Sequence, residues 1–165
     1  MQIRRILYPT DFSEATKVAA SSACELADKF GAELHVLHVL HDLSSLMPFT
    51  AISLWTDPEH IAEIADGAKR MLSEIPAADW SQGKAVVRKV SVGNVADEIT
   101  TYARQHGIDL IVIGTHGHAG LKHAVLGSIA EKVVRTAGCP VLTIRLKEAE
   151  VLTNMLLNTA PVLLD

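Results

Sequence analysis

Apolar residues follow two alternating patterns along the chain. Short apolar runs bounded by turn or cap residues predict strands, whereas longer stretches with apolar positions three or four residues apart predict helices. The predicted strands span residues 3–8, 33–40, 85–92, 109–113 and 141–144. The run 33–40 is apolar apart from Glu33 and two histidines, which is typical of a strand buried on both faces.

Four predicted helices connect these strands. They span residues 14–30, 58 to just before Pro76, 95–106 and 128–137. Good capping residues stand at their starts: Ser13, Asp57, Asn94 and Ser128, the last in a capping-box pattern with Glu131.

The regular alternation of strands and helices predicts the fold class. Connections that contain a helix favour right-handed crossovers between parallel strands. We therefore expect an α/β domain with a doubly wound, Rossmann-like, five-stranded parallel sheet and helices on both faces. With 165 residues, of which 48% are hydrophobic, the chain suits one core rather than two.

Two segments lie outside this alternation. Residues 41–56 have no clean period and an apolar content that is unusual for a solvated loop, so we expect a lid or a surface that meets a partner. The final segment, residues 146–165, carries one apolar helical stripe. We expect it to be a C-terminal extension that packs on its own domain, which would span residues 1–145, or on a second subunit.

Charge and composition exclude several classes of protein. The formal net charge of -4 argues against a general electrostatic grip on nucleic acid. The first residues form neither a secretory signal nor a membrane span, so we expect a cytoplasmic protein without membrane insertion. Cys24 and Cys139 lie far apart in the sequence and are expected to be reduced, largely buried thiols.

The segment 114–128, GTHGHAGLKHAVLGS, combines glycines with basic side chains and contains no carboxylate. Gly114, Gly117 and Gly127 allow positive φ angles and a close approach of a ligand to the backbone. A helix starts at the end of the segment, and its first amides attract an anion. The pattern predicts a phosphate site, although it matches neither the P-loop nor the dinucleotide-binding fingerprint.

The spacing G-x-x-G, nine residues, G-[ST] resembles the nucleotide-binding signature of the universal stress protein family. The resemblance extends from ILYPTDFSE at 6–14 through LHVL at 37–40 to GCPVLTI at 138–144. It implies a sheet in the order 3-2-1-4-5, with strands one and four adjacent. It also implies binding of an adenine nucleotide, ATP, ADP or AMP, by a regulatory or sensor protein of the stress response.

The resemblance also implies roles for individual residues. Asp11 would hold ribose hydroxyls, Val39 would line the adenine, and Ile113 would precede the phosphate loop. Gly114, Gly117, Gly127, Ser128 and Ile129 would bind the ribose and phosphates, with Pro9 and Thr10 beside this loop. The basic character of the segment itself favours phosphate contacts for His116 and His118, with solvated side chains or a metal site as the alternatives.

The sequence gives one further reason for ribose binding by Asp11 and also allows a different role. If Ser13 caps the first helix, the Asp11 carboxylate need not do so and can accept hydrogen bonds from two sugar hydroxyls. Aspartate is also common in turns and caps, so a purely structural role is the alternative.

The sequence supports a metal site or a catalytic site less well than it supports a nucleotide-binding site. His35, His38 and His41 are three residues apart, so on a strand they point to alternating faces and cannot converge. No set of residues positions a nucleophile for phosphoryl transfer, so at most slow ATP hydrolysis is expected. Mg²⁺ or Mn²⁺ would arrive with the nucleotide, held mainly by its phosphates.

Two functions other than nucleotide sensing remain open, and the sequence also bears on the oligomeric state. The chain could be a weak ATPase or autophosphorylating enzyme, or a dimeric interaction module that does not use nucleotide. The family resemblance implies a homodimer through the last strand and the C-terminal extension, and an apolar strand at a sheet edge, which needs a cover, agrees with it.

Overall fold

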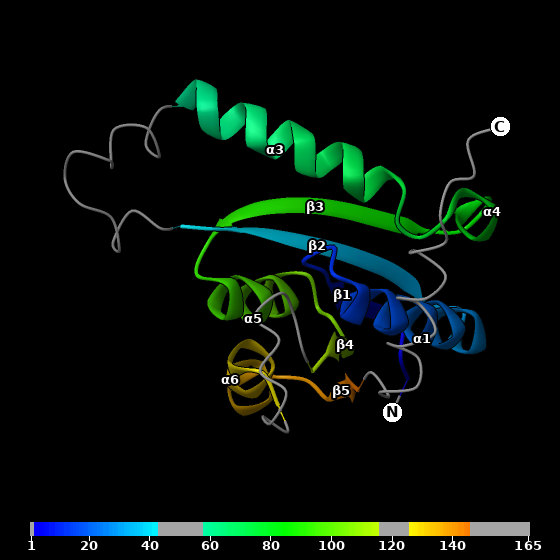
Figure 1. The fold of residues 1–165 in the computed structure, drawn as a ribbon. Coiled ribbons are helices and arrows are strands. Elements are labelled where there is room, and N and C mark those ends of the chain that lie inside the picture. The colour runs from blue at the N-terminus through cyan, green and yellow to red at the C-terminus, as the bar shows by residue number, and fades with distance from the viewer. Residues whose placement is uncertain (1, 43–57, 116–125, 146–165) are drawn as a thin grey trace, which may run out of the picture.

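The computed structural model describes residues 2–42, 58–115 and 126–145. Five parallel strands form one sheet in the order β3-β2-β1-β4-β5, as the sequence and the family resemblance predict. The strands are β1 (Arg5–Pro9), β2 (Glu33–His41), β3 (Val86–Gly93), β4 (Leu110–Gly114) and β5 (Val141–Ile144). Figure 1 shows β3 and β5 at opposite edges of this sheet.

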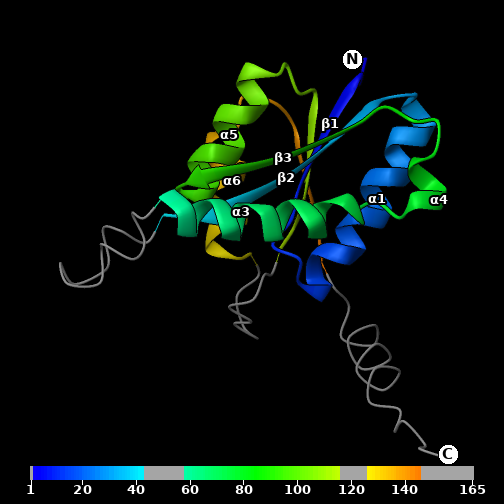
Figure 2. The ribbon, with the colours of Figure 1, turned by 90° about the horizontal axis from the view of Figure 1, so that it is seen from above.

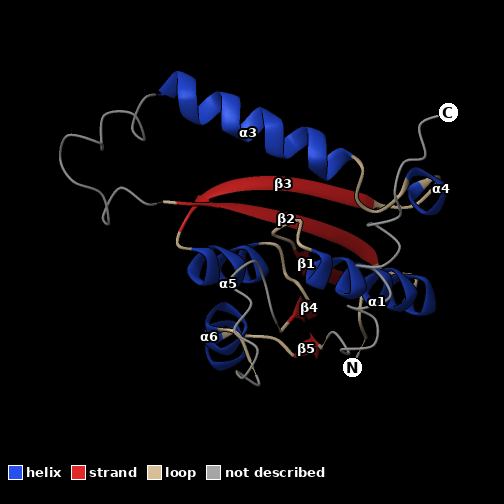
Figure 3. Cartoon of the chain, viewed as in Figure 1, coloured by secondary structure: helices blue, strands red, loops and turns tan. Residues whose placement is uncertain are grey.

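Helices cover both faces of the sheet (Figure 3). The four predicted helices are α1 (Glu14–Phe30), α3 (Pro58–Ser73), α5 (Val95–Gln105) and α6 (Ser128–Thr136). Helices α1 and α3 pack on one face, and α5 and α6 pack side by side on the other. In the view from above in Figure 2, α5 and α6 lie together on the left and α1 lies on the right. A short helix, α4 (Ala78–Ser81), was not predicted.

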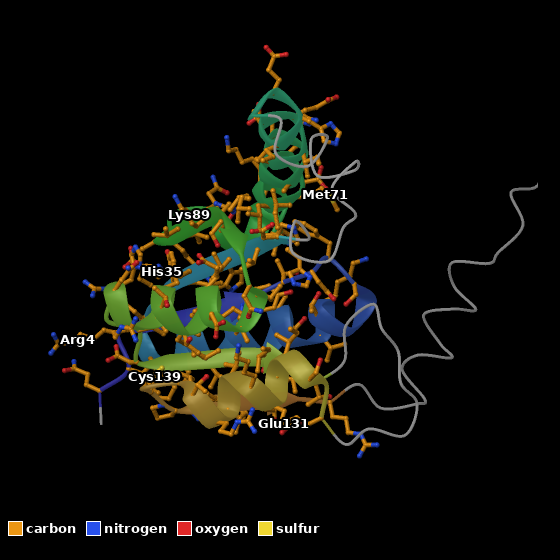
Figure 4. The ribbon with its side chains drawn as sticks, turned by 90° about the vertical axis from the view of Figure 1, so that its left-hand side faces the viewer. Arg4, His35, Met71, Lys89, Glu131 and Cys139 are labelled. Atoms are coloured by element: carbon orange, nitrogen blue, oxygen red, sulfur yellow. The ribbon has the colours of Figure 1, made fainter. Side chains whose placement is uncertain are left out.

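The sheet divides the hydrophobic core into two clusters, one on each face. Neighbouring strand residues point to opposite faces, so Leu7 and Leu37 join the core under α5 and α6, whereas Tyr8 and Val36 join the core under α1 and α3. All four side chains are at most 1% exposed. Figure 4 shows the resulting separation, with Met71 of α3 and Glu131 of α6 at opposite ends of the view.

Of two predicted helix caps, Ser13 is correct in position only and Ser128 is wrong. Ser13 occupies the N-cap position of α1, but its side chain makes no capping bond and its buried hydroxyl has no partner among the described residues. Ser128 is the first residue of α6 rather than its N-cap, so the capping box with Glu131 does not form. Gly127 takes the N-cap position instead, with an extended backbone that an N-cap residue requires.

Other predictions differ only in detail or fall outside the described residues. Gly114 lies in β4, so its backbone is extended rather than at positive φ. Asp57, the C-terminal extension and all but the first two residues of segment 41–56 fall outside the described residues. No described helix is both long enough and apolar enough to cross a bilayer.

Candidate functional site

A cleft of about 310 Å³ lies at the carboxyl ends of β1 and β4. The chain leaves β1 toward α1 on one face of the sheet and leaves β4 toward α6 on the other face. This divergence makes a topological switch point, the place where open parallel sheets bind ligands. The cleft therefore lies where the fold itself leaves space for a small molecule.

Most of the residues predicted for a binding site meet in this cleft. Nine of them line it: Pro9, Thr10, Asp11, Val39, Ile113, Gly114, Gly127, Ser128 and Ile129. The other three, His116, Gly117 and His118, lie outside the described residues. The sequence alone did not identify seven further lining residues, which are Thr16, Leu37, His41, Val95, Ile99, Thr115 and Ala130.

One wall of the cleft is apolar. Leu37 and Val39 come from β2, Val95 and Ile99 from the start of α5, and Ile113 from β4. Aliphatic side chains of this kind suit the flat face of an aromatic ring. The missed residues Val95 and Ile99 belong to the side of α5 that packs on the core, and nothing in the sequence indicates that this side also borders a cleft.

The backbone of Val39 adds polar groups to that wall. Leu37 accepts a hydrogen bond from the Thr10 amide at 2.9 Å, so its backbone groups face β1. Alternate residues of a strand face the same neighbour, so Val39 also directs its N–H and C=O toward the β1 side. Because β1 ends at Pro9, no described strand lies beside them there. They form a donor and an acceptor at the edge of the cleft.

Asp11, which also lines the cleft, stabilises the turn that follows β1. Its Oδ1 accepts hydrogen bonds from the Ser13 amide at 3.0 Å and from the Thr16 hydroxyl at 3.2 Å. The expectation that Ser13 would relieve Asp11 of capping is therefore wrong, because the carboxylate organises this turn itself. A carboxylate has about four acceptor positions, so this duty is compatible with binding further donors.

The start of α6 supplies amide donors. Its first intrahelical hydrogen bond runs from the Glu131 amide to the Gly127 carbonyl at 2.8 Å. The amides of Ser128, Ile129 and Ala130 precede that bond, and a helix offers its first amides no intrahelical acceptor. All three residues line the cleft. Together with the helix dipole, they favour an anion at this position.

Close packing fixes the helix start against β4. The Gly127 amide donates to the Thr115 carbonyl at 2.7 Å, and a Cβ at Gly127 would lie 2.7 Å from the same oxygen. Real Cβ atoms essentially never come closer than 3.0 Å to such an atom. Gly127 is thus required for close approach, at an ordinary φ of -68°.

The described residues of the cleft include few side chains of the kinds that ligate metals. No group of three or more His, Cys, Asp or Glu side chains that could hold a metal ion occurs among the described residues. As predicted, His35 and His38 lie on opposite faces of β2, the former beside Tyr102 and the latter beside Phe12. Asp11 is the carboxylate among the described lining residues.

Comparison with known proteins places the chain in a family. A relative from Methanocaldococcus jannaschii, universal stress protein MJ0531, is 32% identical over 148 residues, which cover 89% of this chain and 85% of the relative. The solved structure of MJ0577, whose sequence is also from that organism, matches with a TM-score of 0.77 at 29% identity, covering 90% of this chain and 99% of the other.

Two more distant solved structures match in fold. One is a universal stress protein in complex with cAMP, with a TM-score of 0.57 and 20% identity over 87% of this chain and 98% of the other. The second, from Archaeoglobus fulgidus, is in complex with dAMP, with a TM-score of 0.58 and 23% identity over 87% of this chain and 99% of the other. The model of the universal stress protein family itself matches residues 2–145. The chain therefore belongs to the universal stress protein family.

Proposed function

We propose that this protein binds an adenine nucleotide, ATP, ADP or AMP, in the cleft and acts as a regulatory or sensor protein in a stress response. One observation carries the proposal: an apolar wall with free backbone groups, a carboxylate and a helix start all meet in one cleft at the switch point. The complexes of two family members with cAMP and dAMP support it.

The cleft matches the three parts of a nucleotide. The adenine ring lies against Val39 and Ile99, and the Val39 backbone donates to and accepts from the edge of the base. The ribose lies beside Asp11, whose carboxylate accepts from its hydroxyls. The phosphates extend toward Ser128 and the first amides of α6, where the helix dipole stabilises negative charge. Predicted contacts of His116, Gly117 and His118 with the phosphates would complete the site.

Binding rather than turnover is the proposed biochemical act. Phosphoryl transfer requires a residue that positions the attacking group and usually a metal held by carboxylates. Among the described lining residues, Asp11 is the carboxylate, and it is assigned to the ribose. We therefore assign Mg²⁺ or Mn²⁺ to the phosphates and water, and at most slow hydrolysis to the protein.

Replacement of Asp11 by asparagine tests the site with little disturbance of the turn. Asparagine keeps a side-chain oxygen that can accept from the Ser13 amide, but it removes the charge. Loss of charge-assisted hydrogen bonds should weaken ATP binding by roughly tenfold to a hundredfold in isothermal titration calorimetry.

A matched control lies at the opposite end of the sheet. Asp109 Oδ2 accepts from the amides of Arg4 and Arg5 at 2.8 and 3.0 Å, so Asp109→Asn also weakens a carboxylate that organises backbone. The control should lower the melting temperature and leave nucleotide affinity unchanged. Absence of binding of ATP, ADP and AMP by the wild type would favour the interaction module, and steady phosphate release abolished by Asp11→Asn would favour the enzyme.

We also propose a homodimer through β5. This strand forms one edge of the described sheet, and Leu142 is 38% exposed there. An apolar edge strand favours pairing with a second copy. Light scattering of the full chain should give the mass of a dimer, and Leu142→Lys should shift it toward the monomer. Truncation after residue 145 then shows whether the extension contributes to the dimer.

A further inference from the structure

The turn that follows β1 has an uncommon backbone conformation. Phe12 has a φ of +65°, in the left-handed region that residues other than glycine rarely adopt. Such a conformation persists only where the surrounding structure holds it, and it is frequent at binding sites. Phe12 directly follows Asp11, so the backbone of this turn determines where the Asp11 carboxylate lies.

Local hydrogen bonds define the shape of the turn. The Phe12 amide donates to Thr10 Oγ1 at 3.0 Å, and the Ser13 amide donates to Asp11 Oδ1 at 3.0 Å. Thr10 Oγ1 also lies 3.2 Å from the Thr16 hydroxyl. These contacts are all internal to the turn and the first turn of α1. They do not by themselves attach the turn to the sheet.

His38 of β2 contacts the turn on both sides of Asp11. Its Nδ1 lies 2.8 Å from the Thr10 carbonyl oxygen, and its ring lies 4.3 Å from the Phe12 ring, tilted by 33°. A carbonyl oxygen only accepts, so Nδ1 carries the proton and donates. His38 is partly buried and does not line the cleft. It reaches the turn from the α1 and α3 face of the sheet.

We propose that His38 is a positioning residue of the cleft, holding Thr10 and Phe12 so that the turn between them presents Asp11 to the ligand. The restraint of the turn follows from the contacts of His38, and its effect on affinity rests on the proposed nucleotide function. The Thr10 amide, bonded to the Leu37 carbonyl, provides a second attachment to β2. His38 adds the attachment beyond Thr10, where the backbone enters its strained conformation.

Two substitutions separate the hydrogen bond of His38 from its packing. In His38→Asn, the side-chain amide nitrogen takes the place of Nδ1, so the donor remains without the ring. In His38→Leu, an apolar side chain remains without a donor. The matched control is His35→Leu, which removes a buried histidine from the opposite face of the same strand, where Nδ1 lies 2.8 Å from the Tyr102 hydroxyl. Figure 4 shows His35 on the same side of the molecule as Arg4 and Cys139.

Amide hydrogen exchange and ATP titration together test the proposal. In His38→Leu, the amides of Phe12 and Ser13 should exchange faster relative to core amides such as that of Ile111, and the Kd for ATP should rise by about tenfold, as expected for loss of one buried hydrogen bond. His38→Asn should recover most of the protection and the affinity. His35→Leu should lower the melting temperature and change neither readout.

Each outcome of this test is decisive. Unchanged protection of the Phe12 and Ser13 amides in His38→Leu would overturn the positioning role, whatever happens to affinity. Faster exchange in a protein whose wild type binds no adenine nucleotide would support the restraint of the turn and overturn the proposed function instead. If His38→Leu does not fold, the ring tautomer in the wild type decides: a proton on Nδ1 in nitrogen-correlated NMR spectra supports the proposal, and an Nε2–H tautomer overturns it.

Discussion

Replacement of Gly127 by alanine tests the packing that aligns α6 with β4. The added Cβ would lie 2.7 Å from the Thr115 carbonyl oxygen, a backbone atom that cannot rotate away, and the two must separate to at least 3.0 Å. The hydrogen bond between the Gly127 amide and the same oxygen is already 2.7 Å long, so the helix start must move or this bond must distort. Overpacking of this kind costs about 1–3 kcal/mol.

The cost appears in both stability and binding. At roughly 2–4 °C per kcal/mol for a domain of this size, Gly127→Ala should lower the melting temperature by about 2–12 °C in differential scanning calorimetry. Because the displaced amides are the proposed phosphate donors, ATP affinity should fall as well.

Gly138 provides the matched control for Gly127. It follows α6, its φ is not positive, and a Cβ added there has nothing within 4 Å. Gly138→Ala should therefore change neither melting temperature nor affinity appreciably. If Gly127→Ala melts and binds ATP like the wild type, the close approach of this helix start to Thr115 is not a real constraint and the account of the site is wrong.

Two further predictions concern stability. Burial lowers the pKa of His35 and of His38 in the folded protein. Between the ordinary histidine pKa near 6.5 and these lower pKa values, the unfolded chain therefore binds protons that the folded chain does not. The free energy of unfolding should consequently fall as pH decreases from about 7 through this range. Calorimetry across this range should show a smaller decrease in His35→Gln, and an unchanged slope would contradict the assignment. Arg88 Nε donates to the Leu72 and Ile75 carbonyls at 3.0 and 2.8 Å. Arg88→Met should therefore lower the free energy of unfolding in urea by about 1–3 kcal/mol, whereas Arg88→Lys should retain part of the stability. Equal stability of Arg88→Met and the wild type would refute this role of Arg88.

Local sequence chemistry predicted some features of the site and missed others. The caps at Ser13 and Ser128 were plausible from residue type, but a cap depends on where the neighbouring backbone lies. Asp11 takes the Ser13 amide because the turn after β1 folds back on itself, and Gly127 becomes the N-cap because only glycine fits against Thr115. No sequence motif predicts either of these two contacts.

The apolar wall of the cleft shows the same limit. Val95 and Ile99 fit the helical pattern of their segment as well as any core residue does, and Leu37 fits a buried strand. They border the cleft because α5 packs next to the end of β2 at the switch point. Hydrophobic periodicity predicts which face of a helix or strand is buried, but it does not show whether protein or a ligand buries that face.

The sequence by itself determined the class of the fold and the placement of the glycine-rich segment after β4. Strand and helix periods are local properties of the chain, and alternation with long connections leaves a parallel, doubly covered sheet as the consistent solution. Only the tertiary structure decided which groups face one another: the Val39 backbone beyond the end of β1, and His38 beneath the turn of Asp11. These arrangements depend on register and on close packing between residues distant in sequence, and both are properties of the whole assembled sheet.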